Sequence, residues 1–413
     1  MYSEALQITD QARRDALIKH ALSSQSETRL KAMVALAETE SDVVLSAELL
    51  DADPWLLAVQ NGIIDLKKGQ FRAGRREDFI TKQAGVSYEP NARCPEWRKF
   101  LNTITEHNKD AANDKKLPDY FQRVIGYTLT GSVEEEVVFV LYGIGKNGKS
   151  TFRQTIHSLL GDYALASDAS LLMERKNPGG ATEEIARLKG RRLIAVNETN
   201  ENEQLQEARL KFITSHDTIT ARNLYGHFFD FFPTHKTFLT TNHKPIVRGT
   251  DEGIWRRIHL LPFTVIIPEN LIQRDFRERR LMPELPGILN WALEGLTVYL
   301  KDGLSPPAVV RAATDEYRQD MDVVGQWLEE RCVRDPTANT PTTIAYNNYK
   351  FWAEDEIGWT LSQVRWRRNL SDRGFEAGKG TNGQRIIKRL RLKDSTVSRM
   401  TVIPGGRSAP PTS

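Results

Sequence analysis

The 413-residue sequence predicts an α/β protein whose core is a mostly parallel sheet built around a phosphate-binding loop. Three observations carry this prediction. Residues 143–150 read GIGKNGKS, an apolar run over 137–142 precedes them, and a segment with helical periodicity over 150–160 follows. A strand, a glycine loop and a helix in this order form an anion site, because backbone N–H groups and the helix N-terminus face the phosphates.

The remaining elements follow from periodicity and turn residues. Residues 1–50 have helical spacing, residues 55–66 predict two strands joined by an Asn61-Gly62 turn, and residues 95–130 are helical again. Strands and helices alternate over 131–265, and helices follow over 270–302. We therefore expect a mainly helical N-terminal region (1–130, with a short hairpin near 55–90) and a core domain (131–303).

A small C-terminal domain is expected over 304–393. Three helical segments are followed by a turn at 378–383 and by an alternating basic and apolar strand at 385–392, which is the order of a winged helix-turn-helix module. Residues 365–393 hold ten Lys and Arg against Asp372 and Glu376, which suits either a polyanion or a solvated basic face. The tail, 394–413, has the composition of a disordered segment.

Bulk properties restrict the class of protein. Net charge is +3, and the two cysteines, Cys94 and Cys332, match no zinc spacing. The sequence contains no apolar stretch of membrane-spanning length and no signal-peptide pattern at its start. We expect a cytoplasmic protein of a bacterial or phage-infected cell.

The loop predicts a site for ATP and Mg²⁺. Lys149 can reach the β- and γ-phosphates, and the Ser150 hydroxyl can bind Mg²⁺. The residues expected to bind the nucleotide are Gly143, Gly145, Asn147, Gly148, Lys149, Ser150 and Thr151.

Three further positions suit phosphoryl transfer. Glu198 ends the segment 191–198, which reads as an apolar strand, and is the candidate acid, acting on the metal or on the attacking water; Asn197 stands where an acid is more usual. Asn242 ends a second apolar strand and can orient that water. Arg256 and Arg257 suit a cation that reaches a neighbouring subunit's γ-phosphate, and a surface ion pair is the structural alternative.

The order of these motifs resembles that of the superfamily 3 helicases, in particular the poxvirus-type and phage/plasmid-type primase C-terminal helicases. The resemblance covers about residues 50–390 and rests on the segments 61–66, 143–150, 192–198, 210–217, 232–236, 240–242, 255–257 and 284–291. It implies an AAA+-type ring, usually a hexamer, that moves single-stranded DNA through its centre.

The resemblance also implies residue roles. Lys149 and Ser150 become the Walker A pair, Glu198 the Walker B acid, Asn242 sensor 1, and Arg257 the first choice of arginine finger, with Arg256 second. The segment 211–236 resembles the motif that carries the pore hairpin. The expected DNA contacts are Arg222, Tyr225, His227 and Lys236, with Arg365, Arg367 and Arg368 in the C-terminal domain; packing of the hairpin base is the alternative for Tyr225 and His227.

Two departures from the family pattern stand out. Ser215-His216-Asp217 replaces a Gly-Gly-Asp type triplet. The region before Asn61 is short and helical, so we expect no primase activity from this chain.

The expected function is ATP-dependent DNA unwinding in phage, plasmid or mobile-element replication. The expected partners are single-stranded or forked DNA, further copies of the chain, and a separate primase or origin-binding protein. The alternatives are an ATP-gated replication initiator and a AAA+ remodeller of proteins, and the basic C-terminal domain argues against the second.

Overall fold

The computed structural model describes residues 2–40, 44–105, 116–174, 181–197, 201, 203–224, 226–249, 251–380 and 383–393. The chain forms two compact units. One comprises Met1–Asp53 with Arg75–Thr81, and the other comprises Pro54–Gly74 with Lys82–Ser413. No helix within these described ranges combines the length and hydrophobicity needed to cross a bilayer.

The first unit is helical, as predicted. It contains α1 (Tyr2–Ala5), α2 (Gln11–Ser24), α3 (Glu27–Ala37) and the short 3-10 helices η1 (Ala47–Leu49) and η2 (Arg76–Asp78). Helix α2 starts where the Asp10 carboxylate accepts the backbone N–H of Arg13 at 2.8 Å. The Asp51 carboxylate accepts the backbone N–H of Thr81 at 2.8 Å, so it joins the two chain segments of this unit.

The second unit begins with an antiparallel sheet and continues into the core domain. The antiparallel sheet is β1 (Leu56–Val59), β2 (Gly62–Asp65) and β3 (Gln70–Arg72). The core strands are β4 (Val138–Tyr142), β5 (Ala164–Asp168), β6 (Leu193–Asn197), β9 (Lys236–Thr241) and β10 (Ile258–Pro262), with a hairpin of β7 (Ile219–Arg222) and β8 (Phe228–Phe231).

The helices of this domain lie between those strands in sequence, except for two helices that follow β10. They are α4 (Pro95–Thr105), α6 (Lys116–Leu129), α7 (Lys149–Leu160), α8 (Ala181–Ala186), α9 (Glu207–Thr214), α10 (Glu252–Trp255), α11 (Leu285–Asp302) and α12 (Ala308–Asp320). Short turns complete them: η3 (Gly161–Tyr163), η4 (Ala169–Leu171), η5 (Glu269–Leu271), η6 (Arg277–Leu281) and η7 (Met282–Glu284).

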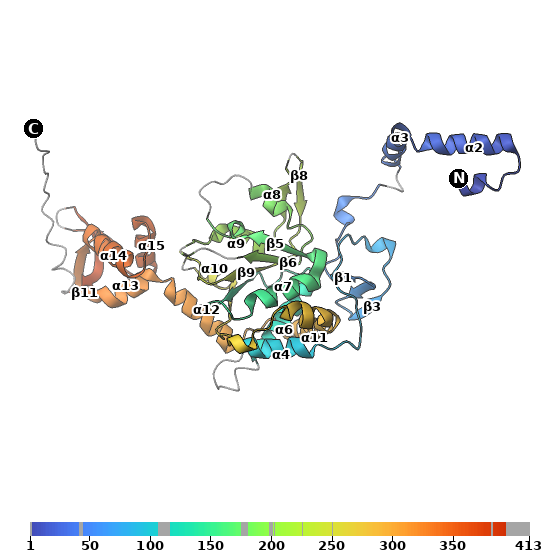
Figure 1. The fold of residues 1–413 in the computed structure, drawn as a ribbon. Helices are drawn as coiled ribbons and strands as arrows, with labels where there is room; N and C mark the ends of the chain where they lie inside the picture. Colours follow the sequence, from blue (N-terminus) through green and yellow to red (C-terminus); the bar gives the residue numbers. More distant parts are fainter. Residues whose placement is uncertain are drawn as a thin grey trace, which may run out of the picture. The chain divides into compact units, whose positions relative to one another are not determined.

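The core sheet has five parallel strands in the order β10-β4-β9-β6-β5, and both of its faces are covered. Alternate residues of β4 enter different hydrophobic clusters: Phe139 and Leu141 on one face, Val138 and Val140 on the other. Helices α4, α6, α7 and α11 gather on the first face (Figure 1). The parallel α/β prediction is confirmed, and the carboxyl ends of all five strands meet at one edge.

Two glycines allow α6 and α11 to pack closely on that first face. A Cβ atom at Gly126 would lie 2.2 Å from the backbone nitrogen of Leu296, and one at Gly295 would lie 2.0 Å from the carbonyl oxygen of Gln122. No side chain fits in either place. The two backbones therefore touch, which explains the glycines in the middle of these helices.

The C-terminal domain contains the three predicted helices and the predicted last strand, together with a strand between the first two helices that the sequence did not predict. Its elements are α13 (Val323–Arg331), β11 (Cys332–Pro341), α14 (Thr342–Glu356), α15 (Gln363–Asp372), β12 (Ala377–Lys379) and β13 (Arg385–Leu392), with sheet order β11-β13-β12. Trp327, Tyr349 and Trp366 form its buried aromatic centre. The expected disorder of 394–413 concerns residues outside the described ranges.

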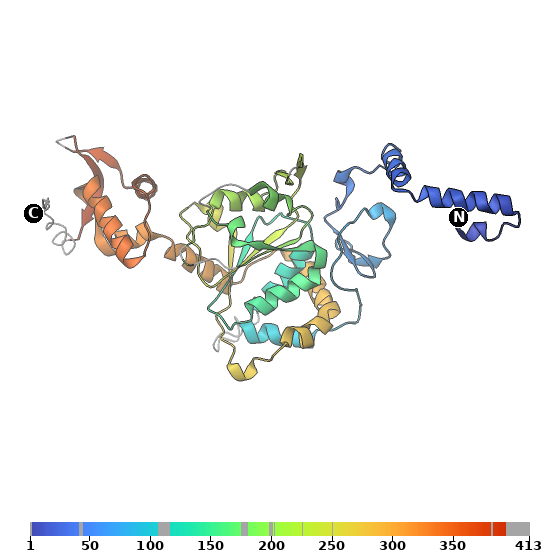
Figure 2. The same cartoon turned by 45° about the horizontal axis from the view of Figure 1, so that its top comes forward.

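Helix α12, which we placed in the C-terminal domain, packs on the core sheet instead. Its Tyr317 lies in the second cluster, with its ring 5.2 Å from that of Trp255 in an edge-to-face contact. The Thr314 hydroxyl accepts the backbone N–H of Leu260 on β10 at 3.1 Å. Figure 2 shows α12 leading from the core into the small domain. The winged-helix fold therefore starts near Val323 rather than at 304.

His259 on β10 makes stability depend on pH. The Tyr120 hydroxyl lies 2.5 Å from its Nδ1, and burial lowers the pKa of His259 to about 4. In the unfolded chain its pKa is about 6.5, so between these values the unfolded state binds the extra proton. This histidine's contribution is therefore complete above about pH 6.5, is lost as the pH falls toward 4, and does not change further below that.

We expect the variant His259→Asn to flatten the acid side of the stability profile. The amide keeps an acceptor for the Tyr120 hydroxyl but does not titrate. The wild type should lose roughly 2 to 3 kcal/mol more than the variant between pH 6.5 and 4.5. Thermal midpoints measured across this range test it, and parallel curves for the two proteins would contradict it. Burial also lowers the pKa of His235 to about 4. The variant therefore removes only the part of the pH dependence of stability that comes from His259.

Candidate functional site

The loop between β4 and α7 has the shape that its sequence predicts. Gly145 (φ 47°) and Gly148 (φ 82°) adopt left-handed conformations, which turn successive backbone N–H groups inward. A Cβ atom at Gly143 would lie 2.0 Å from the carbonyl oxygen of Phe263, and the Asn147 amide donates to that same oxygen at 2.9 Å. Asn147 is thus a clamp that holds the loop against the end of β10. Ser150 is exposed and Thr151 is half-buried at the start of α7.

Lys149 and Asn242 come together at the carboxyl edge of the sheet. The Lys149 side chain is 5% exposed, and its Nζ donates to the Gly143 carbonyl and to the Asn242 Oδ1, the latter at 3.0 Å. Tyr142 at the end of β4 is in register with Thr241 at the end of β9, which puts the two loops side by side. Lys149 and Asn242 therefore lie side by side at this edge of the sheet.

The acidic partner, Glu198, lies outside the described residues. The strand that leads to it is β6, whose last residue, Asn197, pairs with Thr240 of β9. Glu198 accordingly follows a strand that ends at the same edge as the phosphate loop. Among the residues that the structure describes, no three His, Cys, Asp or Glu side chains group as a metal site.

The paired arginines follow α10 and differ sharply in exposure. Arg257 has a side chain 10% exposed, and its NH2 lies 2.8 Å from Glu136 Oε2, while its NH1 donates to Thr214 Oγ1 at 3.3 Å. Arg256 is 60% exposed and pairs with the same Glu136 oxygen at 2.9 Å. Arg256 therefore has the more accessible guanidinium, although Arg257 was the first choice in the sequence-based expectation. The sequence analysis missed Glu136, which stands in an acidic run typical of a solvated turn.

The predicted hairpin is formed by β7 and β8. Arg222 is in register with Phe228, and its guanidinium lies 5.0 Å from the Phe228 ring centre. Arg222 and His227 are exposed, as is Phe228 at 64%, while Tyr225 lies outside the described residues. The hairpin therefore presents a cation and an aromatic ring together, and Phe228 is a residue that the sequence analysis did not select.

Lys236 is not available for a DNA contact, which corrects the sequence-based expectation. Its side chain is 2% exposed, and its Nζ donates to the carbonyl oxygens of Thr130, Ser132 (3.1 Å) and Thr234 (3.3 Å). Burial, followed by the nearby Arg192 charge, lowers the pKa of Lys236 well below its usual value. The side chain is buried, and it binds the carbonyl oxygens of Thr130 and Ser132 just after the C-terminal end of α6.

The C-terminal arginines lie on α15, the third helix of the winged-helix domain. Arg365 and Arg368 are exposed and Arg367 is half-buried. Arg365 and Arg368 also line a groove with Arg248, and the acidic Glu207 and Asp251 line it too. Their exposure is compatible with the predicted phosphate contacts.

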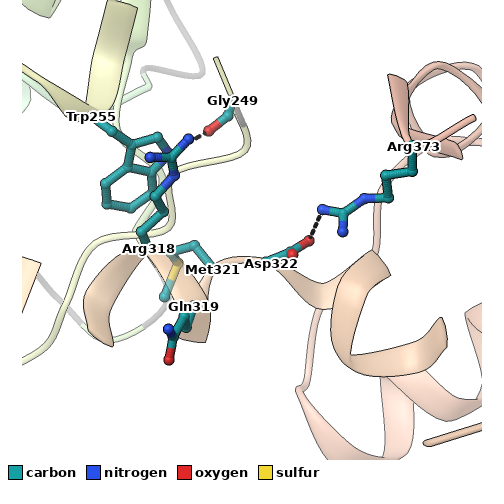
Figure 3. Close-up of a pocket in the computed structure, with 7 residues that line it drawn as sticks. All are labelled: Gly249, Trp255, Arg318, Gln319, Met321, Asp322 and Arg373. Atoms are coloured by element: carbon teal, nitrogen blue, oxygen red, sulfur yellow. Dashed lines mark hydrogen bonds and ion pairs between the residues drawn. The ribbon is translucent and has the colours of Figure 1, made fainter. Parts of the chain in front are cut away.

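A cavity next to the arginine pair is lined by none of the phosphate-loop residues. Figure 3 shows it between Trp255, Arg318 of α12 and the Asp322–Arg373 pair of the winged-helix domain. The Trp255 indole donates to the Gly249 carbonyl oxygen at 2.9 Å, and Asp322 pairs with Arg373 at 2.6 Å. The bond to Gly249 fixes Trp255, the residue directly before Arg256.

Two parts of the chain match known families. Residues 1–106 match the family described as D5 N terminal like, and residues 141–257 match a family of unknown function, DUF5906. The first match reaches the start of the chain, beyond the span 50–390 on which the resemblance rested. The second covers the phosphate loop, the hairpin and both arginines.

Relatives with replication names cover most of the chain. A protein of Acanthamoeba polyphaga mimivirus, whose name, helicase L207/L206, is itself provisional, is 30% identical over 324 residues, covering 73% of this chain and 33% of the relative. A protein of African swine fever virus with the provisional name primase C962R is 26% identical over 315 residues, covering 71% and 32%. The chain thus spans about a third of the length of these relatives.

Among solved structures, the C-terminal region of NrS-1 (305-718) is similar. Its TM-score is 0.48 at 12% identity, and the likeness covers 82% of each chain.

Proposed function

We propose that this chain, which belongs to the D5-like primase-helicase family, hydrolyses ATP in order to move along single-stranded DNA and to unwind duplex DNA during replication. The observation that carries the proposal is the contact between Lys149 and Asn242 beside the glycine loop. A nearly buried ammonium, an amide and inward N–H groups at one sheet edge suit a triphosphate and little else.

The residues at this edge suit Mg-ATP in distinct ways. The backbone N–H groups of the loop and the N-terminus of α7 hold the phosphates, and Lys149 places its charge where negative charge develops on transfer. The Asn242 amide exchanges its Lys149 contact for the attacking water, and Glu198 accepts a proton from it or holds the metal. The Ser150 hydroxyl would hold Mg²⁺, which when bound would neutralise charge on the phosphates.

The hairpin is the proposed DNA contact. Arg222 can pair with a phosphate while Phe228 stacks on a base, a combination that grips a strand without reading its sequence. His227 at the tip adds a second polar contact. Arg365, Arg367 and Arg368 are proposed to hold DNA at the C-terminal domain. The proposed assembly is a ring of identical copies, usually six, and a separate primase or origin-binding protein is its proposed partner.

We expect the double substitution Arg222→Ala with His227→Ala to weaken single-stranded DNA binding at least tenfold. The salt dependence of the affinity should also fall, since a phosphate contact is lost. Fluorescence anisotropy with a labelled oligonucleotide measures both quantities. Lys301→Ala, an exposed lysine on α11, is the matched control and should bind like the wild type. Equal affinity in the double variant would remove the hairpin from the DNA path.

The function itself is tested by strand displacement on a forked substrate. Light scattering on the same sample, with and without nucleotide and DNA, reports the assembly. The proposal expects an oligomer that displaces the strand only with hydrolysable ATP. Slow turnover that single-stranded DNA does not change, without displacement, would instead indicate an ATP-gated replication initiator.

A further inference from the structure

One carboxylate, that of Glu136, binds side chains from two other parts of the chain. Arg256 and Arg257 both reach its Oε2, at 2.9 and 2.8 Å, and the Nε2 of His216 lies 3.6 Å from its Oε1. The Glu136 carbonyl oxygen also accepts from Arg257 at 3.2 Å. Glu136 adopts a left-handed backbone conformation, with φ of 51°, which is costly for a residue with a side chain.

This cluster lies at the opposite edge of the sheet from the phosphate loop. Glu136 precedes β4 and Arg257 precedes β10, and the backbone N–H of Val138 donates to the Arg257 carbonyl oxygen at 2.7 Å. The phosphate loop follows the other end of the five-residue β4, about 16 Å away at 3.3 Å per residue. An arginine here cannot reach its own chain's triphosphate, so a phosphate that replaced Glu136 as its partner would belong to another molecule.

The two arginines that share this oxygen are not equivalent. The Arg256 pair is exposed, and exposed ion pairs are weak enough for a phosphate to displace the carboxylate. The Arg257 pair is nearly buried and has the Thr214 hydroxyl as a further acceptor, so its release would leave charges unpaired inside the protein. When Arg256 leaves, Arg257 still neutralises Glu136.

Neighbouring contacts fix the rest of the cluster. Trp255 is held by its bond to the Gly249 carbonyl oxygen and by its contact with Tyr317, so the backbone at Arg256 is anchored. His216 stands in the triplet that departs from the family's Gly-Gly-Asp pattern, and here it lies beside the second Glu136 oxygen. The histidine of this unusual triplet therefore contacts Glu136 in the structure.

We propose that Glu136 is a positioning residue that holds Arg257 as a fixed anchor and Arg256 as a releasable arm, which leaves Glu136 for the γ-phosphate of a triphosphate bound to a neighbouring copy of the chain. This inference rests on the proposed function, because it requires hydrolysis at a subunit seam. It assigns to Glu136 a role on the subunit that donates the arginine, and none on the subunit that holds the nucleotide.

That asymmetry gives a direct test by mixed assemblies. Two full-length variants are co-expressed on different tags and purified on both. Lys149→Ala lacks a working nucleotide site but keeps Arg256, and Arg256→Ala has the converse defect. Each alone should be inactive, and together they should recover ATP turnover at seams where the first donates Arg256 to the second.

Glu136→Gln is then added to one partner at a time. On the Lys149→Ala subunit, which donates Arg256, it should lower the recovered turnover at least tenfold. On the Arg256→Ala subunit, which holds the nucleotide, turnover should stay within twofold. A merely structural Glu136 would affect both mixtures equally, and that result would overturn the inference. Absence of recovery in the first mixture would also overturn it.

The test separates this inference from the proposed function. If the wild type does not hydrolyse Mg-ATP, the proposed function fails before any mixing. If the wild type hydrolyses it and the mixtures behave alike, only the role of Glu136 fails. Should Glu136→Gln not fold, Glu136→Asp replaces it in the test. The shorter side chain keeps the negative charge for Arg257 but moves the shared oxygen away from Arg256. Turnover should again fall only when the substitution is on the subunit that donates Arg256.

Discussion

Replacing Lys149 with alanine is expected to lower ATP turnover about 10³-fold or more, because the substitution removes the cation at the developing phosphate charge. Lys149 is nearly buried, and its ammonium lies between the Gly143 carbonyl and the Asn242 amide. Water has little access to this position and cannot replace the charge. DNA unwinding should stop together with turnover.

Lys146 provides the matched control for this experiment. It belongs to the same loop, but its side chain is 59% exposed and pairs with Glu269 at 2.6 Å on the surface. Lys146→Ala should retain turnover within a few-fold, since an exposed pair contributes little. Steady-state phosphate release and ATP binding, measured on both variants, check the prediction. Equal losses in both would mean that the loop needs general positive charge rather than Lys149.

Replacing Arg257 with alanine is expected to destabilise the core domain by about 3 to 5 kcal/mol, as is typical when one partner of a buried ion pair is removed. The substitution leaves the Glu136 carboxylate with the exposed Arg256 and with His216, and it leaves the Glu136 carbonyl and the Thr214 hydroxyl without this donor. Arg256→Ala, whose ion pair is exposed, should cost less than about 1 kcal/mol.

Thermal unfolding of the two variants separates the roles of the adjacent arginines. We expect Arg257→Ala to unfold at a clearly lower temperature, and Arg256→Ala to unfold near the wild type while losing turnover with ATP binding intact. The opposite outcome, a stable Arg257→Ala without turnover, would restore Arg257 as the residue that reaches the neighbouring phosphate.

Contiguous motifs were the part of the local structure that the sequence predicted well. The loop over 143–150 carries its own conformational requirements, since its glycines adopt left-handed angles that few other residues tolerate. Asn242 was also predicted, although 93 residues separate it from Lys149, because both follow apolar strands and parallel strands end at a common edge. The winged-helix order followed from the succession of helical and alternating segments.

Burial of charged side chains was the part that the sequence did not predict. Lys236 begins a strand next to a predicted DNA-binding hairpin, yet its ammonium binds carbonyl oxygens under the sheet. Helix α12 has a polar, helical sequence like that of its neighbours, and contacts such as those of Tyr317 and Thr314 show that it packs on the core domain. In each case the deciding partner lies far away in the sequence.

The sequence by itself determined the glycine loop, the parallel direction of the strands around it and the modules on either side, because glycine conformations and hydrophobic periods are properties of short segments. Only the tertiary structure decided which of two adjacent arginines is an anchor and which is accessible. That difference depends on one carboxylate, 120 residues earlier than Arg256, which the fold brings within 2.9 Å. Exposure and ion pairing are properties of the packed chain, so residue type alone does not encode them.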